Sequence, residues 1–204
     1  MKKIVLAAIA VVALGTSSYA QQQVKFGPKA GVSFANLSKG SDFNDAKMRT
    51  AFHVGAVAEI KFNDKFSLQP EVLYSAQGSE ITRGTNNAYV TSTIKNDYIN
   101  IPIMAKYYIV EGFSIEAGPQ VGFLMKSETE STANVAGISA GGKVDTKSNF
   151  NSTDFGVNFG LAYDLPQGFF INGRYNLGLT DVVKDNKGDA VKNNVIQVGV
   201  GYKF

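Results

Sequence analysis

Alternation of apolar with polar or small side chains, repeated every second residue, is the feature that most constrains the fold of this chain. The segment 193–204 has the sequence NNVIQVGVGYKF. Its apolar positions all share one parity: Ile196, Val198, Val200, Tyr202 and Phe204. Because successive side chains of a strand point to opposite faces, this pattern predicts a β-strand with one apolar face and one polar or small face.

Seven further segments alternate in the same way, at roughly 24–37, 50–62, 66–77, 93–109, 113–123, 155–164 and 169–179. Short turns connect three neighbouring pairs of segments, at 63–65, 110–112 and 165–168. These turns contain Asn, Asp, Gly and Pro, the residues that turns favour. Longer connections separate the other pairs, at roughly 38–50, 84–92, 127–150 and 182–192. All long loops should therefore lie at one end of an antiparallel sheet and all short turns at the other, as in outer-membrane barrels.

Alternation alone does not say whether the apolar face points inward, as in a lipocalin-like barrel, or outward to lipid. The spacing of aromatic residues favours lipid. Phe52 and Phe62 bracket one apolar face, and Phe113 and Phe123 bracket another. Ten residues rise about 33 Å along a strand. At a tilt of about 40° this projects to about 25 Å, the height of the lipid-facing band between two aromatic girdles.

The opposite face consists mainly of Gly, Ser, Asn and Gln, with isolated charges of both signs. A narrow barrel interior needs small residues and pairable charges. The pattern therefore predicts an all-β, eight-stranded, antiparallel up-and-down transmembrane β-barrel. Eight strands leave an interior just wide enough to be filled by side chains, which argues against an open diffusion pore. Four prolines within the segments predict bulges or strand ends nearby: Pro28, Pro70, Pro102 and Pro119.

Seven charged residues fall on the predicted inner face: Lys29, Glu59, Lys61, Glu71, Lys106, Glu116 and Arg174. Unpaired buried charges are costly, so we expect a structural salt-bridge network here rather than a carboxylate cluster for acid–base chemistry. His53 is the only histidine and has no Ser or carboxylate at motif spacing, so a hydrogen-bonded lumen histidine is expected. With one His and no Cys, a transition-metal site would lack its usual ligands. We therefore expect no catalytic residue, no metal and no cofactor.

The first twenty residues have the features of a secretory signal peptide. Lys2 and Lys3 precede an apolar run at 4–14, and small residues lead to a cleavage site after Ala20. The run is too short to span a bilayer as a helix. We expect residues 1–20 to be removed and 21–204 to form the barrel domain. Without the two leader lysines the formal charge falls from +3 to +1, which gives no indication of a nucleic-acid partner.

Five stretches carry a resemblance to a known family: GPKAGVSFANL (27–37), YINIPIMAKYYI (98–109), FSIEAGPQVGFLM (113–125), DFGVNFGLAYDL (154–165) and GRYNLGLTDV (173–182). They resemble small outer-membrane β-barrel proteins of Gram-negative bacteria, often described as PorT-like or "porin family", with an architecture similar to the OmpX and OmpA barrels. The resemblance implies export to the outer membrane and contact with outer-membrane lipid. It also implies that the barrel-assembly machinery recognises the final strand, whose Tyr202 and Phe204 match the usual terminal aromatics.

The connection 127–150 is the best candidate for binding an extracellular or secretion-system protein. Weak alternation at 127–136 and 143–150 indicates that the flanking strands extend beyond the membrane as a hairpin, and function tends to lie on loops carried by a rigid scaffold. A surface loop without a fixed partner is the alternative. The sequence thus favours a non-enzymatic membrane scaffold that presents loops for structural, adhesion or partner-binding roles. A component of protein export, a small gated channel and a lipid-modifying enzyme stay open as alternatives.

Overall fold

A computed structural model describes residues 23–38, 46–85 and 88–204. The predicted signal peptide lies outside the described residues, as does most of the predicted connection 38–50. The strands are β1 (Gln23–Ser38), β2 (Lys47–Lys61), β3 (Phe66–Thr85), β4 (Ala88–Val110), β5 (Phe113–Val135), β6 (Ile138–Asp145), β7 (Thr153–Asp164), β8 (Phe169–Gly178) and β9 (Lys192–Tyr202). One 3-10 turn, η3 (Lys147–Asn149), precedes β7. No helix in these described ranges is long and apolar enough to cross a membrane.

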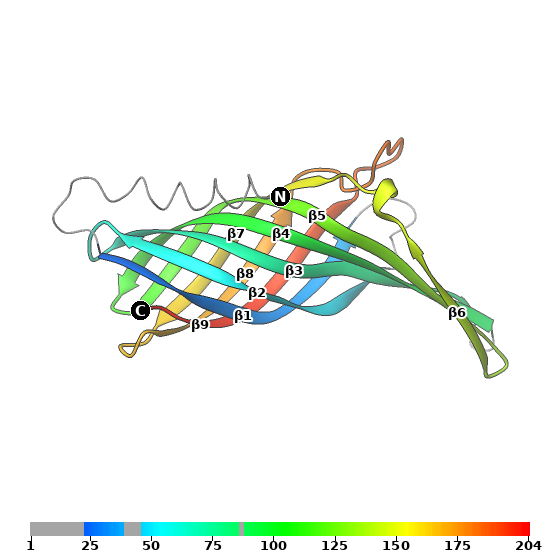
Figure 1. The fold of residues 1–204 in the computed structure, drawn as a ribbon, viewed down its shortest axis with the longest axis horizontal. Coiled ribbons are helices and arrows are strands. Elements are labelled where there is room, and N and C mark those ends of the chain that lie inside the picture. The colour runs from blue at the N-terminus through cyan, green and yellow to red at the C-terminus, as the bar shows by residue number, and fades with distance from the viewer. Residues whose placement is uncertain (1–22, 39–45, 86–87) are drawn as a thin grey trace.

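Eight of the strands form a closed antiparallel ring, in the order β1-β2-β3-β4-β5-β7-β8-β9 (Figure 1). The ring closes between β1 and β9, in a register that runs from Lys29 opposite Gly201 to Ser38 opposite Lys192. Beyond β9 the same register continues to the last residue, where Phe204 donates to the Phe26 carbonyl at 2.9 Å and accepts from the Phe26 amide at 3.2 Å. Closure leaves no open sheet edge within the ring, as a bilayer requires. The predicted eight-stranded barrel is confirmed.

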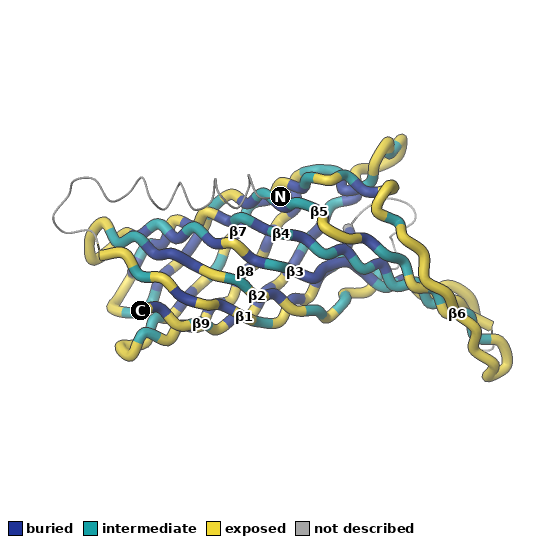
Figure 2. Tube along the Cα trace, viewed as in Figure 1, coloured by how far each residue is buried: buried dark blue, intermediate teal, exposed yellow. Residues whose placement is uncertain are grey.

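The polar face of the strands points inward and the apolar face outward. Strand β8 shows this at every position, because Phe169, Ile171 and Tyr175 are exposed while Asn172 and Arg174 are buried. The same alternation covers the barrel wall (Figure 2). The orientation predicted for a lipid-facing barrel is therefore the one observed.

Outward-facing aromatic rings gather near both ends of the wall. At the short-turn end Phe66 lies 4.9 Å from Tyr107, and Phe169 lies 4.9 Å from Tyr202, measured between ring centroids. At the opposite end Phe52 lies 5.8 Å from Tyr74. These contacts lie where aromatic girdles meet the two bilayer interfaces.

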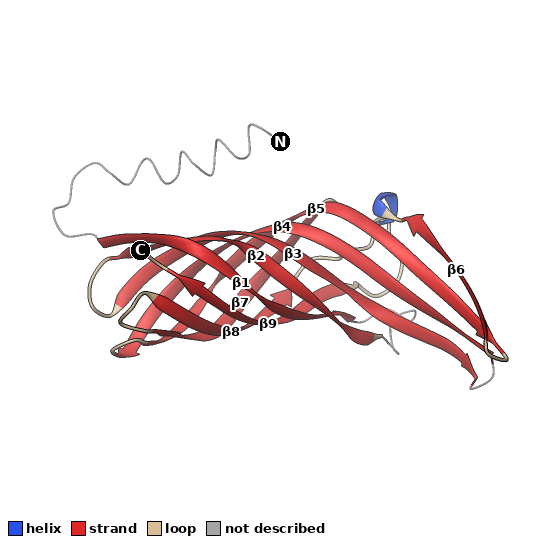
Figure 3. Cartoon of the chain, turned by 60° about the horizontal axis from the view of Figure 1, so that its bottom comes forward, coloured by secondary structure: helices blue, strands red, loops and turns tan. Residues whose placement is uncertain are grey.

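Two of the predicted long loops are mostly strand. The ladder between β3 and β4 continues to Thr85 opposite Ala88, so the expected loop 84–92 is wrong. Strand β5 continues to Val135 and turns back as β6, with Glu128 opposite Asp145. The connection 127–150 is thus a hairpin, although β6 ends before η3 and β7 begins separately. Cross-strand pairing continues through these segments, and strands β3 to β6 project from one end of the barrel (Figures 1 and 3).

The prolines do not mark bulges. Each of the four lies within a ladder whose register is the same on both sides of it. A proline can keep its place in a ladder where its missing N–H is not required as a donor. The register shifts occur elsewhere, between Met48 and His53, between Asp97 and Tyr98, and between Tyr108 and Val110.

Candidate functional site

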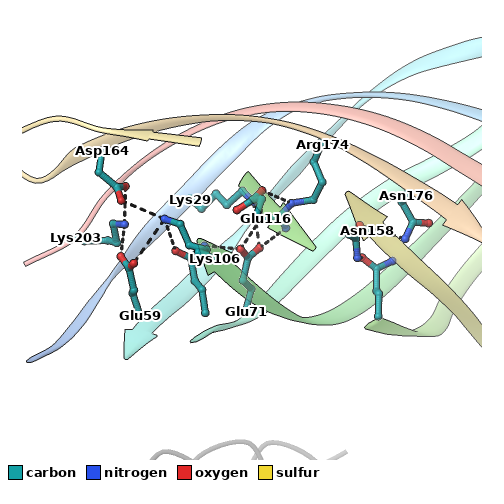
Figure 4. A network of polar contacts seen from close by, with 12 residues as sticks. Lys29, Glu59, Glu71, Lys106, Glu116, Asn158, Asp164, Arg174, Asn176 and Lys203 are labelled. Carbon is teal, nitrogen blue, oxygen red and sulfur yellow. Dashed lines mark hydrogen bonds and ion pairs between the residues drawn. The ribbon is translucent and has the colours of Figure 1, made fainter. Parts of the chain in front are cut away.

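A group of four charged side chains crosses the middle of the lumen (Figure 4). We call it the central charge cluster: Lys29 on β1, Glu71 on β3, Glu116 on β5 and Arg174 on β8. Arg174 donates two bonds to Glu71, at 3.0 and 2.9 Å, and its Nε donates to Glu116 at 2.8 Å. Lys29 pairs with Glu71 at 3.1 Å. All four are buried, and two cations balance two carboxylates.

A second group lies nearer the short-turn end. This turn-end charge cluster consists of Glu59 on β2, Lys106 on β4, Asp164 on β7 and Lys203 after β9. Lys106 lies 3.1 Å from Asp164 and 3.6 Å from Glu59, and Lys203 lies 2.7 Å from Asp164 and also pairs with Glu59. The Tyr108 hydroxyl contacts both carboxylates, with Asp164 at 2.6 Å. Here too the charges balance.

Gln69 joins the two clusters. Its Nε2 donates to Glu71 at 2.7 Å, and its Oε1 lies 3.5 Å from the ammonium of Lys106. The polar contacts thus run continuously along the lumen from its middle to the short-turn end (Figure 4). Such a network stabilises the folded barrel only when all its charged members are present. A charged member that lost its partner would be a buried uncompensated charge.

The structure brings together six of the seven charges placed on the inner face from the sequence. The seventh, Lys61, forms no ion pair in the described part of the chain, and its ammonium lies 4.8 Å from the centre of the Tyr108 ring. Sequence reasoning omitted Asp164, Lys203 and Tyr108 from the network. Asp164 and Lys203 have inward parity, so alternation could have found them, but both lie at strand ends next to turns or the terminus.

His53 is buried and lies beside Ser33, with 3.0 Å between its Nδ1 and the serine Oγ. Its Nε2 has no hydrogen-bond partner within the described ranges. A methyl group on Gly199 would come within 3.0 Å of that nitrogen, so the small residue makes room for the ring. No group of three metal-ligating side chains occurs among the residues that the structure describes.

Toward the other end of the lumen, most of the polar contacts are made by amide side chains. Asn158 donates to Gln120 at 3.2 Å and accepts from Asn176 at 3.2 Å. Farther along, Asn193 donates to Gln77. The first three side chains lie on the neighbouring strands β5, β7 and β8, whereas the contact between Asn193 on β9 and Gln77 on β3 crosses the lumen above the central charge cluster.

A hydrophobic cluster closes the lumen at this end. Its buried members are Leu37, Ile81, Ile94, Tyr98, Leu124, Phe150, Val182 and Val191. Phe150, Val182 and Val191 belong to the connections before β7 and β9. Backbone bonds hold these connections together, with Asn151 donating to Val182 and Val182 donating to Val191, both at 2.9 Å. The predicted loop 182–192 therefore partly covers the end of the barrel. We call the cluster of eight buried residues the hydrophobic cap.

The projecting parts of β3, β4 and β5, with all of β6, form a four-stranded antiparallel sheet, which we call the protruding sheet. Glu128 on its outer face pairs with Lys126 at 2.9 Å and with Lys143 at 2.6 Å. Lys95 pairs with Glu130 on the same face. Hydrogen bonds from Lys143 and Lys126 lower the pKa of the Glu128 carboxyl.

The inner face of the protruding sheet continues the lumen-facing side of the wall, and its outer part is not covered by any other segment that the structure describes. Apolar side chains stand exposed on it: Val90, Val135, Ile138 and Val144. Every residue of β6 is exposed, and Ile138 is 77% exposed. Val135 lies directly opposite Ile138 in the ladder between β5 and β6, and exposed apolar patches mark interaction sites.

Among the residues described, strand β6 is the edge of the protruding sheet, because it pairs with β5 on one side only. Thr146 donates to the Ser127 carbonyl at 3.0 Å, which makes 127 opposite 146 a hydrogen-bonded pair. Such pairs alternate along an antiparallel ladder. The residues of β6 that alternate with these pairs therefore direct their N–H and C=O groups away from β5. They are Ser139, Gly141, Lys143 and Asp145.

Residues 19–184 match the family model of the outer membrane protein β-barrel domain. This chain belongs to that family. Ail and Neisserial surface protein A are among the solved structures that share its fold. The chain is 16% identical to Ail, the attachment invasion locus protein of Yersinia pestis, solved with the heparin analogue sucrose octasulfate, with 89% of this chain and 99% of Ail covered and a TM-score of 0.51. It is 15% identical to Neisserial surface protein A, with the same coverage and a TM-score of 0.53. No curated protein matches this chain.

Membership of this family gives the barrel its orientation. Outer-membrane barrels have short turns on the periplasmic side and longer connections outside the cell. The protruding sheet and the hydrophobic cap therefore belong to the extracellular end. The turn-end charge cluster and the last residue belong to the periplasmic end.

Proposed function

We propose that this outer-membrane barrel is a non-conducting, non-enzymatic scaffold whose protruding sheet binds a partner protein outside the cell. One observation carries the proposal: side chains fill the lumen from the hydrophobic cap to the turn-end charge cluster, whereas the protruding sheet leaves an edge strand and an apolar face without partners within the described ranges. The groups available to bind another protein are therefore on the protruding sheet.

The filled lumen argues against a gated channel. A conducting path would have to displace the hydrophobic cap, part the amide contacts and break both charge clusters. Breaking one buried pair by removing a partner typically costs about 3–5 kcal/mol. A role in protein export through the lumen meets the same obstacle.

A lipid-modifying enzyme has little support from the position of His53. The ring is buried inside the barrel, and its contact with Ser33 also lies in the lumen. No carboxylate of the described residues hydrogen-bonds to the ring, so nothing orients it as a general base. A lipid substrate on the outer wall would not reach it.

The edge of β6 fits an extended segment of another protein. Outward-directed N–H and C=O groups can pair with an added strand, and alternate side chains then supply specificity. The apolar face beside this edge offers burial. The heparin analogue is bound by Ail. On this chain Lys95, Lys126 and Lys143 are each paired with glutamates, so the sheet favours a protein strand over a polyanion.

A photo-cross-linking residue at Ala140, on the apolar face of β6, tests the proposal in intact cells. We expect a discrete protein adduct there and none from the same residue at Ile171 on the lipid-facing wall. Ser139→Pro should abolish the adduct, because it removes an outward-directed donor and leaves the β5 ladder bonds. Ser139→Ala, which removes only a side chain, should preserve it. A normally assembled barrel without any adduct at Ala140 would refute the proposal.

We further propose that residues 1–20 direct export and are removed, and that Tyr202 and Phe204 are recognised by the barrel-assembly machinery. The leader is supported by its basic start, apolar run and small residues before Gln21. The mass of the protein purified from outer membranes tests cleavage. We expect the mass of a chain that begins at Gln21.

A further inference from the structure

A cavity of about 460 Å³ opens at the periplasmic mouth of the barrel, directly beyond the turn-end charge cluster. Its lining includes Lys25, Lys61, Glu111, Leu165 and Phe169. The volume falls within the range of small-ligand sites, about 300–1,000 Å³. The cavity lies at the opposite end of the molecule from the protruding sheet, so what it binds is independent of the proposed function.

The charged groups in the deep wall of this cavity are all paired with one another. Glu59 and Asp164 also line it, but Lys106 and Lys203 pair with both of them. Two carboxylates and two ammonium groups cancel. A ligand in the cavity would therefore interact electrostatically with the remaining charged groups at the mouth.

Those remaining groups are two lysines and one glutamate. Lys25 lies opposite Glu59 in the ladder between β1 and β2, and Lys61 follows Glu59 by two residues on the same inner face. The two lysines are thus diagonal neighbours, a separation that long side chains bridge. Neither of them, nor Glu111, forms an ion pair within the described part of the chain, although Lys61 lies over the Tyr108 ring.

The outer rim of the cavity is apolar and faces the membrane. Tyr163, Leu165 and Phe169 line it, with 44%, 38% and 57% of each residue exposed. Phe169 also belongs to the aromatic contacts at the short-turn end. The cavity therefore joins an aqueous side carrying two ammonium groups to a lipid side carrying exposed apolar groups.

We propose that this cavity binds the headgroup of a glycerophospholipid from the periplasmic leaflet. Lys25 and Lys61 hold the phosphate, because two adjacent ammonium groups without carboxylate partners provide charge-assisted donors. The apolar rim carries the acyl chains. Glu111 selects a zwitterionic headgroup, whose ammonium it attracts, over an anionic one.

Native mass spectrometry of the delipidated protein in a phosphate-free maltoside detergent tests the site. The probes are phosphatidylethanolamine, phosphatidylglycerol and inorganic phosphate. We expect one phosphatidylethanolamine per barrel, bound at least tenfold more tightly than inorganic phosphate. Glu111→Gln should reduce the preference over phosphatidylglycerol.

The variant Lys25→Gln/Lys61→Gln should lose at least tenfold in affinity for phosphatidylethanolamine. Neither lysine is fully buried, so this variant should fold, which the gel mobility of unheated samples verifies. The control Lys126→Gln/Lys143→Gln changes two lysines at the other end and should bind as the parent does. Equal affinity of the parent and the Lys25→Gln/Lys61→Gln variant would overturn the site. Equal binding of inorganic phosphate and phosphatidylethanolamine would overturn the assignment to a lipid.

Discussion

Removing Arg174 should destabilise the barrel more than any single change of a surface charge. In Arg174→Met, Glu71 and Glu116 keep only Lys29 as a counter-charge, so the central charge cluster carries one uncompensated carboxylate. Three of the lost bonds are charge-assisted, at 2.8, 2.9 and 3.0 Å. Removing one partner of a buried pair costs about 3–5 kcal/mol. Since about 1.4 kcal/mol is a factor of ten, the folding equilibrium constant should fall by about two to four orders of magnitude.

Equilibrium unfolding in urea, with the protein folded into phosphatidylcholine vesicles, measures this loss. The chain contains no Trp, so circular dichroism and gel mobility are the appropriate signals. The decisive comparison is Arg174→Met/Glu116→Gln, which removes one charge of each sign and leaves the Lys29–Glu71 pair. This double variant should recover most of the lost stability. If it is as unstable as Arg174→Met, or if Arg174→Met costs less than about 1 kcal/mol, the reasoning about uncompensated charge is refuted.

Three further perturbations address the closure of the ring, the hairpin and assembly. Gly27→Ala should destabilise the barrel by about 1–3 kcal/mol in the same unfolding assay, because the new methyl group would meet the Tyr202 backbone across the closing ladder. Hydrogen bonding that lowers the pKa of Glu128 stabilises the hairpin above its ordinary pKa and is lost as the pH falls through the lowered value. Acidification below about pH 4 should therefore shift the β6 amide signals in NMR spectra. Deleting 202–204 should reduce the amount of assembled barrel in the outer membrane.

Each of these has a matched control. Gly173→Ala should be nearly neutral, since a methyl group there has no atom of the described chain within 4 Å. Glu128→Gln should reduce the pH-dependent shift of the Lys143 amide signal; an unchanged shift in this variant would have another source, such as Glu130 opposite Lys143. Tyr202→Ala/Phe204→Ala keeps Lys203 and its ion pairs. Full assembly of this double variant would mean that the deletion acts through stability and not through recognition.

The barrel could be predicted from the sequence because its strands obey a period of two. A bilayer outside and a narrow polar lumen inside impose the same alternation on every strand, as in β8. Lys29, Glu71 and Arg174 were found for this reason. Their pairing could also be predicted, because the interior of an eight-stranded barrel is narrow and an unpaired charge buried there is costly.

The extracellular end could not be predicted in the same way. Outside the membrane both faces of a strand meet water, so the segments at 78–85 and 88–92 lack the contrast that marks a strand in the wall. The hydrophobic cap could not be predicted from the sequence for a different reason. Phe150, Val182 and Val191 are single apolar residues within polar connections, and only the three-dimensional path of those connections brings them together.

Conductance across a planar bilayer tests the central claim most directly, namely that the barrel is closed and filled. Purified protein, shown to be folded by its gel mobility, should insert without reproducible conductance steps. Arg174→Met/Glu116→Gln should behave in the same way, because the cap and the turn-end charge cluster remain. Reproducible large steps from the unaltered protein would contradict the filled lumen and, with it, the proposed role as a scaffold.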